Sequence, residues 1–367
     1  MNYNYNLEVI TPTHIGDGNS YSNKEYFTSQ AKLNKTREVT VINKLNLTEY
    51  LKNISSEQQD KFLEKLSHFT IDNKDKREFN FESYIKEHNT IKKYIEYKTI
   101  EEIKKEKHPT RIDSTIKNIN YKAYIPGSSI KGTIKTAIIY DYLDKENPTT
   151  IADYKYICKS PEIEKIMSNI SISDSSEYKN NIRTVQIMPF TLIKEGDNKK
   201  INDTNKGDMY NAIECIYPYN LNIELKITDE DIITDEYMKK ALRLFNYDYI
   251  QHEIKFFTKM HENEKDINKK RNILNIIEFY ESLKEKNTND SPLIRLGGST
   301  GLLSTTIGLH MKNNNPNLYH EIYKSNDNKR NQKPGRNTKN NKNEEYPKVR
   351  QITPNYNAFG WCKLSSI

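Results

Sequence analysis

The sequence predicts an α+β fold of ferredoxin-like type. Apolar and polar residues alternate along residues 2–9, which predicts a strand with one buried face. Apolar residues recur at helical spacing along residues 130–143 and again along 235–257, so two long helices are expected. Short strands and helices of this kind around one sheet favour an α+β sandwich.

Composition limits the class of protein. The 367 residues fit one large domain or two ordinary ones, and 57 Lys and Arg against 50 Asp and Glu give a net charge of +7. This balance permits a polyanionic partner without requiring one. The three cysteines, Cys158, Cys215 and Cys362, form no CxxC pair, so no zinc site, metal or cofactor is predicted and reduced thiols in a cytoplasm are expected.

The N-terminus and the apolar runs bear on location. No basic region followed by an apolar one opens the chain, so no signal peptide is expected. No apolar run approaches the roughly 20 residues that span a bilayer. We therefore expect a soluble, cytoplasmic protein with no membrane partner.

The first third of the chain predicts further strands and helices. Residues 24–45 contain one or two strands, and residues 48–67 carry the apolar spacing of a helix. Charge density rises afterwards, and Ile91, Ile95, Ile100 and Ile103 are spaced helically. Residues 68–108 are therefore interpreted as a charged helical insertion that Pro109 ends.

Residues 121–143 predict a short strand, a turn and a helix. Ser128 or Ser129 is the expected N-cap, because a serine hydroxyl accepts a free N–H of the first helical turn. The free N–H groups and dipole of such a helix start attract phosphate, and Lys131 and Lys135 flank the apolar face there. The alternative is an ordinary capped turn with two solvated lysines.

The second half predicts a boundary and then more strands and helices. Residues 168–182 have the composition of a loop, and the domain boundary is placed there. The remaining elements are a strand at 183–194 broken by Pro189, a hairpin over 209–227, helices at 235–257 and 266–283, and terminal strands at 349–352 and 359–364. Residues 324–342 hold seven Lys or Arg and one acid, which predicts a flexible basic segment.

A glycine-rich stretch at 297–308 is a further candidate phosphate-binding site. It contains four glycines, more than the one or two that a tight hairpin turn needs. Clustered glycines expose backbone N–H groups and let a sugar–phosphate chain come close. A bulged connection without a ligand is the alternative.

Three segments together resemble the RAMP superfamily, the RNA-binding subunits of CRISPR effector complexes. They are the opening Thr11-Pro12-Thr13-His14-Ile15-Gly16-Asp17-Gly18, the middle Ile125-Pro126-Gly127-Ser128-Ser129-Ile130-Lys131-Gly132, and the late Arg295, Gly297, Gly298 and Gly301. The family commonly has a lysine before a threonine of the pair 305–306, and this chain has Ser304 or Thr305 in that position. With the terminal 359–364, these segments are similar to the subunit-five family of type III-A CRISPR (Csm) complexes.

The resemblance implies two RRM-like (ferredoxin-like) domains with helical insertions, at 1–182 and 183–367. It implies a non-catalytic subunit that binds the guide RNA (crRNA), caps the backbone of related subunits at the crRNA 3′ end and assists 3′ maturation. The implied partners are crRNA, target RNA indirectly, other RAMP backbone and small Csm subunits, and host nucleases.

The residues assigned to RNA binding combine these motifs with nearby cations. Backbone and charge contacts of this kind carry no sequence preference, which suits a protein that accepts any guide. The assigned residues are His14, Gly16, Gly18, Ser128, Ser129, Lys131, Gly132, Lys135, Arg183, Arg295, Gly297, Gly298, Ser299, Gly301 and Arg350.

Two alternatives stay open at this point. Some RAMP proteins are metal-independent endoribonucleases that process CRISPR repeat RNA with a loop histidine, and His14 is the one candidate acid or base here. The opening segment is more similar to that of the non-catalytic subunits. The other alternative is a subunit that contacts only proteins.

Overall fold

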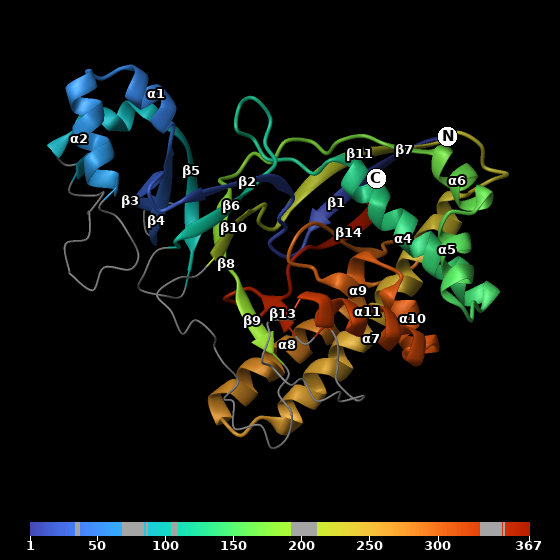
Figure 1. The fold of residues 1–367 in the computed structure, drawn as a ribbon. Helices are drawn as coiled ribbons and strands as arrows, with labels where there is room; N and C mark the ends of the chain where they lie inside the picture. Colours follow the sequence, from blue (N-terminus) through green and yellow to red (C-terminus); the bar gives the residue numbers. More distant parts are fainter. Residues whose placement is uncertain are drawn as a thin grey trace.

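The strands in the described part of the protein form two large sheets and a small two-stranded one (Figure 1). The computed structural model describes residues 1–33, 37–67, 84, 85, 87–103, 109–191, 211–330, 347 and 349–367. The predicted mixture of strands and helices is confirmed.

The five-stranded sheet is built around the N-terminal strand. Strand β1 (Asn2–Val9) pairs antiparallel with β11 (Tyr219–Ile227) on one side and with β14 (Trp361–Ser366) on the other. Strands β7 (Ile170–Ile172) and β12 (Leu293–Arg295) form the two edges. Tyr5, Leu7 and Val9 are buried, as their alternation predicted, because the period of a strand sends them to one face.

Two long helices pack with this sheet in one core. Helix α4 (Gly127–Glu146) buries Ile130, Ile134, Ala137 and Ile138, and it packs against α7 (Asp235–Asn263). In chain order the elements are β1, α4, β7, β11, α7 and β14, and in space the strands run β14-β1-β11-β7. This order is the ferredoxin-like arrangement, and its six elements are spread over nearly the whole length of the chain.

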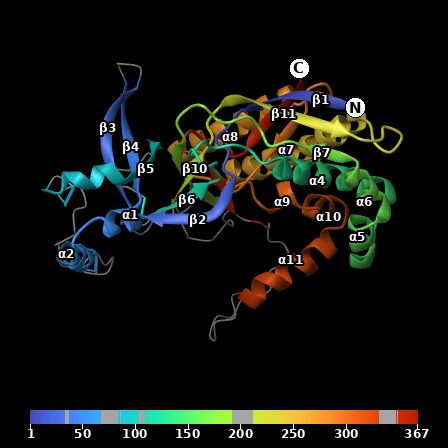
Figure 2. The ribbon, with the colours of Figure 1, turned by 90° about the horizontal axis from the view of Figure 1, so that it is seen from above.

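The seven-stranded sheet carries a small helical subdomain at its far end (Figures 1 and 2). In its apolar cluster, Tyr50, Phe62 and Ile91 pack against residues of the sheet. Helices α1 (Leu47–Lys52) and α2 (Ser56–Ser67) and the 3₁₀ helix η1 (Asn89–Tyr94) supply these residues. The strands in spatial order are β2 (Gly16–Ser22), β6 (Arg111–Thr115), β10 (Asn211–Cys215), β8 (Arg183–Gln186), β5 (Ile95–Glu102), β4 (Arg37–Leu45) and β3 (Tyr26–Leu33).

Both sheets take strands from before and after residue 182. The predicted division at residue 182 therefore does not assign the two sheets to separate parts of the chain. The predicted hairpin over 209–227 is wrong, because β10 pairs with β6 and β8 while β11 pairs with β1 and β7. The terminal strands also part: β14 joins the five-stranded sheet, and β13 (Val349–Ile352) pairs with β9 (Met188–Thr191).

The predicted charged helix over 68–108 is confirmed only in part where the structure describes it: residues 84, 85 and 87 are helical and residues 89–94 form the 3₁₀ helix η1. Residues 95–102 form β5, which pairs with β4 and β8, so strand pairing overrides the helical spacing of its isoleucines. Residues 68–83 and 104–108 lie outside the described residues. The single helix predicted at 48–67 is two helices, α1 and α2.

The remaining helices lie beside the five-stranded sheet. The predicted helix at 266–283 is confirmed as α8 (Ile267–Lys286). Residues 324–330 of the predicted basic segment continue a helix, and residues 331–342 lie outside the described residues. The others are α5 (Ile151–Cys158), α6 (Pro161–Ser168), α9 (Leu302–Thr305), α10 (Gly308–Asn314) and α11 (Pro316–Arg330). In the described part of the chain, no helix combines the length and apolarity that crossing a bilayer requires.

Candidate nucleic-acid interface

The opening loop and the glycine-rich loop are in direct contact. The N–H of Gly298 donates to the carbonyl oxygen of His14 at 2.8 Å. Gly297 has a φ of +85°, and a Cβ there would overlap the same carbonyl group. The positive φ and the close contact at residue 297 both require glycine. Together with the hydrogen bond from Gly298, they fix the backbones of the two motifs relative to each other.

The His14 side chain is enclosed by this contact. It is 7% exposed, and its Nδ1 lies 2.8 Å from the carbonyl oxygen of Glu214. A carbonyl oxygen only accepts, so Nδ1 carries the hydrogen. A Cβ on Gly16 would lie 3.2 Å from Nε2, and one on Gly298 would lie 2.9 Å from Cδ2. The ring therefore lies between two glycines, which leaves it little space for a substrate.

A buried ionic network lies next to the opening loop. The carboxylate of Glu214 is fully buried and accepts from Lys117 Nζ at 2.6 Å, from Tyr21 Oη at 2.8 Å and from the Thr115 N–H at 3.1 Å. Lys117 Nζ also lies 4.5 Å from the ring centre of Tyr97. Burial, with the Glu214 charge beside it, raises the pKa of Tyr97 far above its ordinary value. This network was not predicted from the sequence, although a lone glutamate in an apolar strand indicates a buried charge that needs a partner.

The start of α4 differs from the prediction. The helix begins at Gly127 after Pro126, and no serine caps it. The carboxylate of Asp174 accepts the Gly127 N–H at 2.9 Å. A Cβ on Gly127 would overlap the carbonyl of Ile172, so the first residue is packed against this segment. An internal carboxylate thus takes the position that the sequence suggested for phosphate.

The same helix approaches the glycine-rich segment one turn further on. Thr133 Oγ1 lies 3.4 Å from the carbonyl oxygen of Arg295. Lys131 is half-buried and donates to the carbonyl of Ile170 at 2.7 Å. The members of the middle motif that reach solvent are therefore Ser128, Gly132 and Lys135; Ser129 is half-buried.

Arg295 is a buried residue, which corrects its prediction as a surface cation. Its side chain is 3% exposed, donates to the carbonyl of Phe359 at 3.0 Å and hydrogen-bonds the Tyr249 hydroxyl. The guanidinium also lies over the rings of Tyr249 and Trp361, at 5.0 and 5.4 Å. Burial raises the pKa of Tyr249 to about 12, although the Arg295 charge opposes that rise.

Arg350 is buried as well. Its Nε donates to both carboxylate oxygens of Glu253, at 2.8 and 2.7 Å, and the guanidinium lies 4.0 Å from the ring centre of Phe256. Burial favours the neutral acid, but the Arg350 charge outweighs it and lowers the pKa of Glu253 below its ordinary value. Arg350 thus belongs to a buried ion pair.

The other predicted residues divide by exposure. Arg183 is separate from the motifs and pairs with Glu102 at 3.2 Å in the seven-stranded sheet. Gly16, Gly18 and Gly301 are exposed, and Ser299 is half-buried with a φ of +63°. Within the described ranges, no three His, Cys, Asp or Glu side chains lie together as metal ligands.

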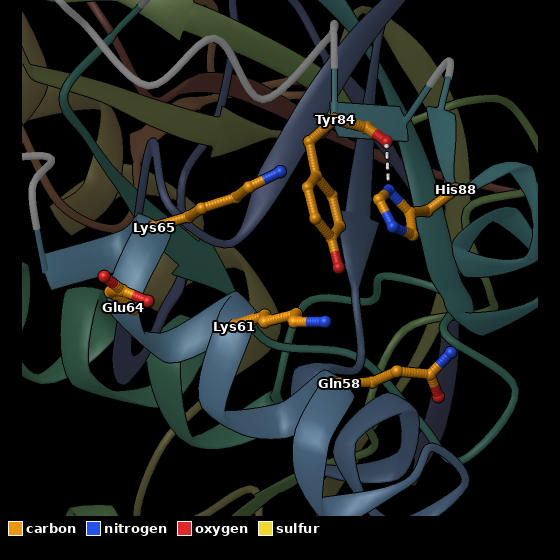
Figure 3. A pocket seen from close by; sticks show the side chains of 6 residues that line it. All are labelled: Gln58, Lys61, Glu64, Lys65, Tyr84 and His88. Carbon is orange, nitrogen blue, oxygen red and sulfur yellow. Dashed lines mark hydrogen bonds between the residues drawn. The ribbon is translucent and has the colours of Figure 1, made fainter.

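A separate hollow lies on the helical subdomain (Figure 3). Lys61 and Lys65 extend from α2 toward Tyr84, whose ring stacks on His88 with 4.2 Å between ring centres. Both lysines have carboxylate partners, Lys61 with Glu57 at 2.6 Å and Lys65 at 3.8 Å from Glu87. This hollow is a charge-balanced surface away from the three motifs. Gln58 and Glu64 complete its lining.

The fold is shared with solved structures of CRISPR proteins. A chain in the cryo-EM structure of a Csm–crRNA–target RNA ternary complex of a type III-A CRISPR-Cas system superposes with a TM-score of 0.65 at 17% identity, covering 100% of both chains. The crystal structure of T. onnurineus Csm5 superposes with a TM-score of 0.57 at 16% identity, covering 97% of this chain and 99% of that one.

Sequence similarity extends over nearly the same length. The CRISPR system Cms protein Csm5 of Methanocaldococcus jannaschii is 26% identical over 348 residues, which cover 87% of this chain and 76% of that protein. Residues 6–359 match the family model of the RAMP superfamily. These residues include all three motifs and every strand of the seven-stranded sheet, and the chain therefore belongs to the RAMP superfamily.

Proposed function

We propose that this protein is a non-catalytic guide-RNA-binding subunit of a type III-A Csm effector complex. In this role it caps the backbone of RAMP subunits at the crRNA 3′ end and assists maturation of that end. The observation that supports it most is the meeting of three small-residue motifs: the Gly298 N–H bonds to His14, and Thr133 lies against Arg295. One structure of similar fold is a chain of a type III-A Csm–crRNA–target RNA complex, and the sequence relative is named a CRISPR system Csm5 protein.

The solvent-facing members of these motifs suit a ribose–phosphate strand. They are Gly16 and Gly18 from the opening loop, Ser128, Gly132 and Lys135 from α4, and Gly301 from the glycine-rich loop. Glycine and serine leave backbone groups accessible, and Lys135 supplies charge. Contacts of this type position a strand without reading its bases. The buried Arg295, Arg350 and His14 then hold the loops that make the contacts.

The proposal also assigns partners and a fold division. The protein would bind crRNA directly and target RNA only through the guide, and it would contact other RAMP backbone subunits, small subunits and host nucleases that trim the 3′ end, in the cytoplasm. We assign the five-stranded sheet with α4 and α7 as one RRM-like unit and the seven-stranded sheet as the second. These units interleave along the chain instead of following one another at residue 182.

The matched pair Gly132→Asp and Gly132→Ala tests the RNA surface. Gly132 is exposed and a Cβ there meets nothing within 4 Å, so both variants fit the fold. We expect the aspartate to repel phosphate and weaken binding of a guide RNA, while the alanine leaves it unchanged. Lys135→Ala should lower the slope of log affinity against log salt by about 0.7, and the exposed Lys155 of α5 is the control. Fluorescence anisotropy at several salt concentrations measures both effects.

Equal affinity of the two Gly132 variants would remove α4 from the interface. The ribonuclease alternative has its own test, which is incubation of purified protein with repeat RNA in EDTA. Because the His14 ring is enclosed and hydrogen-bonded through Nδ1, we expect no cleavage. A product that disappears in His14→Ala would favour the enzyme instead.

A further inference from the structure

A small cavity lies beside the glycine-rich loop, and His14 is not among the residues that line it. Its volume is about 230 Å³, and it is bounded by residues 299–303 of the loop, by β13 and by side chains of α7 and α8. Gly301, Val349 and Gln351 are exposed, so the cavity opens to solvent between the loop and β13. Gly301 is the residue that this cavity shares with the RNA surface proposed above.

The walls of the cavity carry an uncompensated positive charge. Its charged lining residues are Arg295, Arg350 and Glu253. Glu253 is paired with Arg350 through both carboxylate oxygens. Within the described part of the chain, the hydrogen-bond partners of Arg295 are a carbonyl and a tyrosine hydroxyl, both neutral. A buried charge without a counter-charge is costly, so the site favours an anion.

One hydrogen-bond donor in this wall is also unused. Arg350 is 6% exposed, and its Nη2 has no hydrogen-bond partner in the described part of the chain. Buried polar groups are nearly always hydrogen-bonded, so such an exception needs an explanation. Because Nη2 has almost no accessible surface, an oxyanion in the cavity bonds it only when the Arg350 side chain shifts toward the cavity; an arginine then bonds the oxyanion through several N–H groups at once.

We propose that this cavity binds a phosphate group. Its volume is below the roughly 300–1,000 Å³ of pockets that hold drug-sized ligands, so a single oxyanion fits the space better than a whole nucleotide. The Ser299 side chain lines the mouth beside the two arginines. Free phosphate and the terminal phosphate of an RNA share the required chemistry. Only the second source depends on the function proposed above.

The full chain is titrated with inorganic phosphate, and sodium chloride at matched ionic strength is the reference. Thermal unfolding should show a saturable stabilisation by phosphate alone. Ser299→Asp puts a carboxylate at the mouth, and Ser299→Asn is the neutral variant of the same shape. Both residues tolerate the positive φ of this position. We expect Ser299→Asp to weaken phosphate binding by at least about tenfold and Ser299→Asn to retain it.

A phosphate effect no larger than that of chloride, or equal phosphate affinity of the two Ser299 variants, overturns the proposal. Guide RNAs ending in a 3′-phosphate or a 3′-hydroxyl then distinguish the sources. Tighter binding of the 3′-phosphate RNA, lost in Ser299→Asp, assigns the cavity to the RNA end. Equal binding of the two RNAs assigns it to free phosphate. The 3′-hydroxyl RNA reports the α4 surface by itself, so failure of the cavity and failure of RNA binding are distinguishable.

Discussion

Replacement of Gly297 by alanine tests whether the contact between the two loops holds this region together. Gly297 has a φ of +85°, and its added Cβ would overlap the His14 carbonyl oxygen and lie 2.9 Å from both the carbonyl carbon and Ile15 Cδ1. The overlapping atoms belong to the backbone, so the loops must separate. Separation breaks the hydrogen bond from the Gly298 N–H to His14.

Two costs add in this variant. An alanine in the left-handed region costs about 1–2 kcal/mol, and the lost backbone hydrogen bond costs about 0.5–1.5 kcal/mol. We therefore expect Gly297→Ala to lower the free energy of unfolding by about 1.5–3.5 kcal/mol. Gly18→Ala is the matched control, because Gly18 has a φ of +86° and a Cβ there meets nothing within 4 Å. It should lose only the conformational part, about 1–2 kcal/mol.

Urea unfolding at 25 °C, followed by circular dichroism, measures both variants against the parent protein. Gly297→Ala should also weaken guide-RNA binding more than Gly18→Ala does, if each is assayed below its unfolding transition. Equal destabilisation of the two variants would refute the reasoning, because the close contact would then contribute nothing beyond the φ angle.

Two further predictions concern the buried ion pairs. Glu253 has a folded-state pKa below its ordinary value of 4.5, so the unfolded chain takes up a proton first as the pH falls. The parent protein should therefore be more stable than Glu253→Gln by an amount that is complete above about pH 4.5 and shrinks below it. Urea midpoints at several pH values measure this difference. An advantage that grows on acidification would contradict this sign. Lys117→Met leaves the Glu214 carboxylate buried without a counter-charge and should cost about 3–5 kcal/mol in thermal or urea unfolding. Met at the exposed Lys155 should change stability by less than about 0.5 kcal/mol, and equal effects at the two positions would exclude the pair as a stabilising element.

Local patterns predicted single elements well and pairings poorly. The alternation of β1 and the helical spacing of α4, α7 and α8 are confirmed, because each depends only on which face is buried. The separation of β10 and β11 into different sheets depends on partners far away in the chain. The same holds for β5, whose helically spaced isoleucines lie in a strand between β4 and β8.

The candidate site shows the same limit at the level of side chains. The three motifs located the loops that meet around His14, since glycines, proline and polar turns are visible in a sequence. Arg295 and Arg350 were expected at the surface, because an arginine in a sequence carries no sign of its burial. Asp174 at the start of α4 was not expected, since it reaches Gly127 from 47 residues away.

The sequence by itself determined the α+β class, the long helices, the central strand and the small-residue motifs that mark the family. These features follow from the side-chain periodicity and backbone freedom of neighbouring residues. Only the tertiary structure decided which strands share a sheet, which cations reach solvent, and that two buried arginines and one glutamate line a cavity. Those outcomes depend on contacts between residues far apart in the chain, which no local pattern specifies.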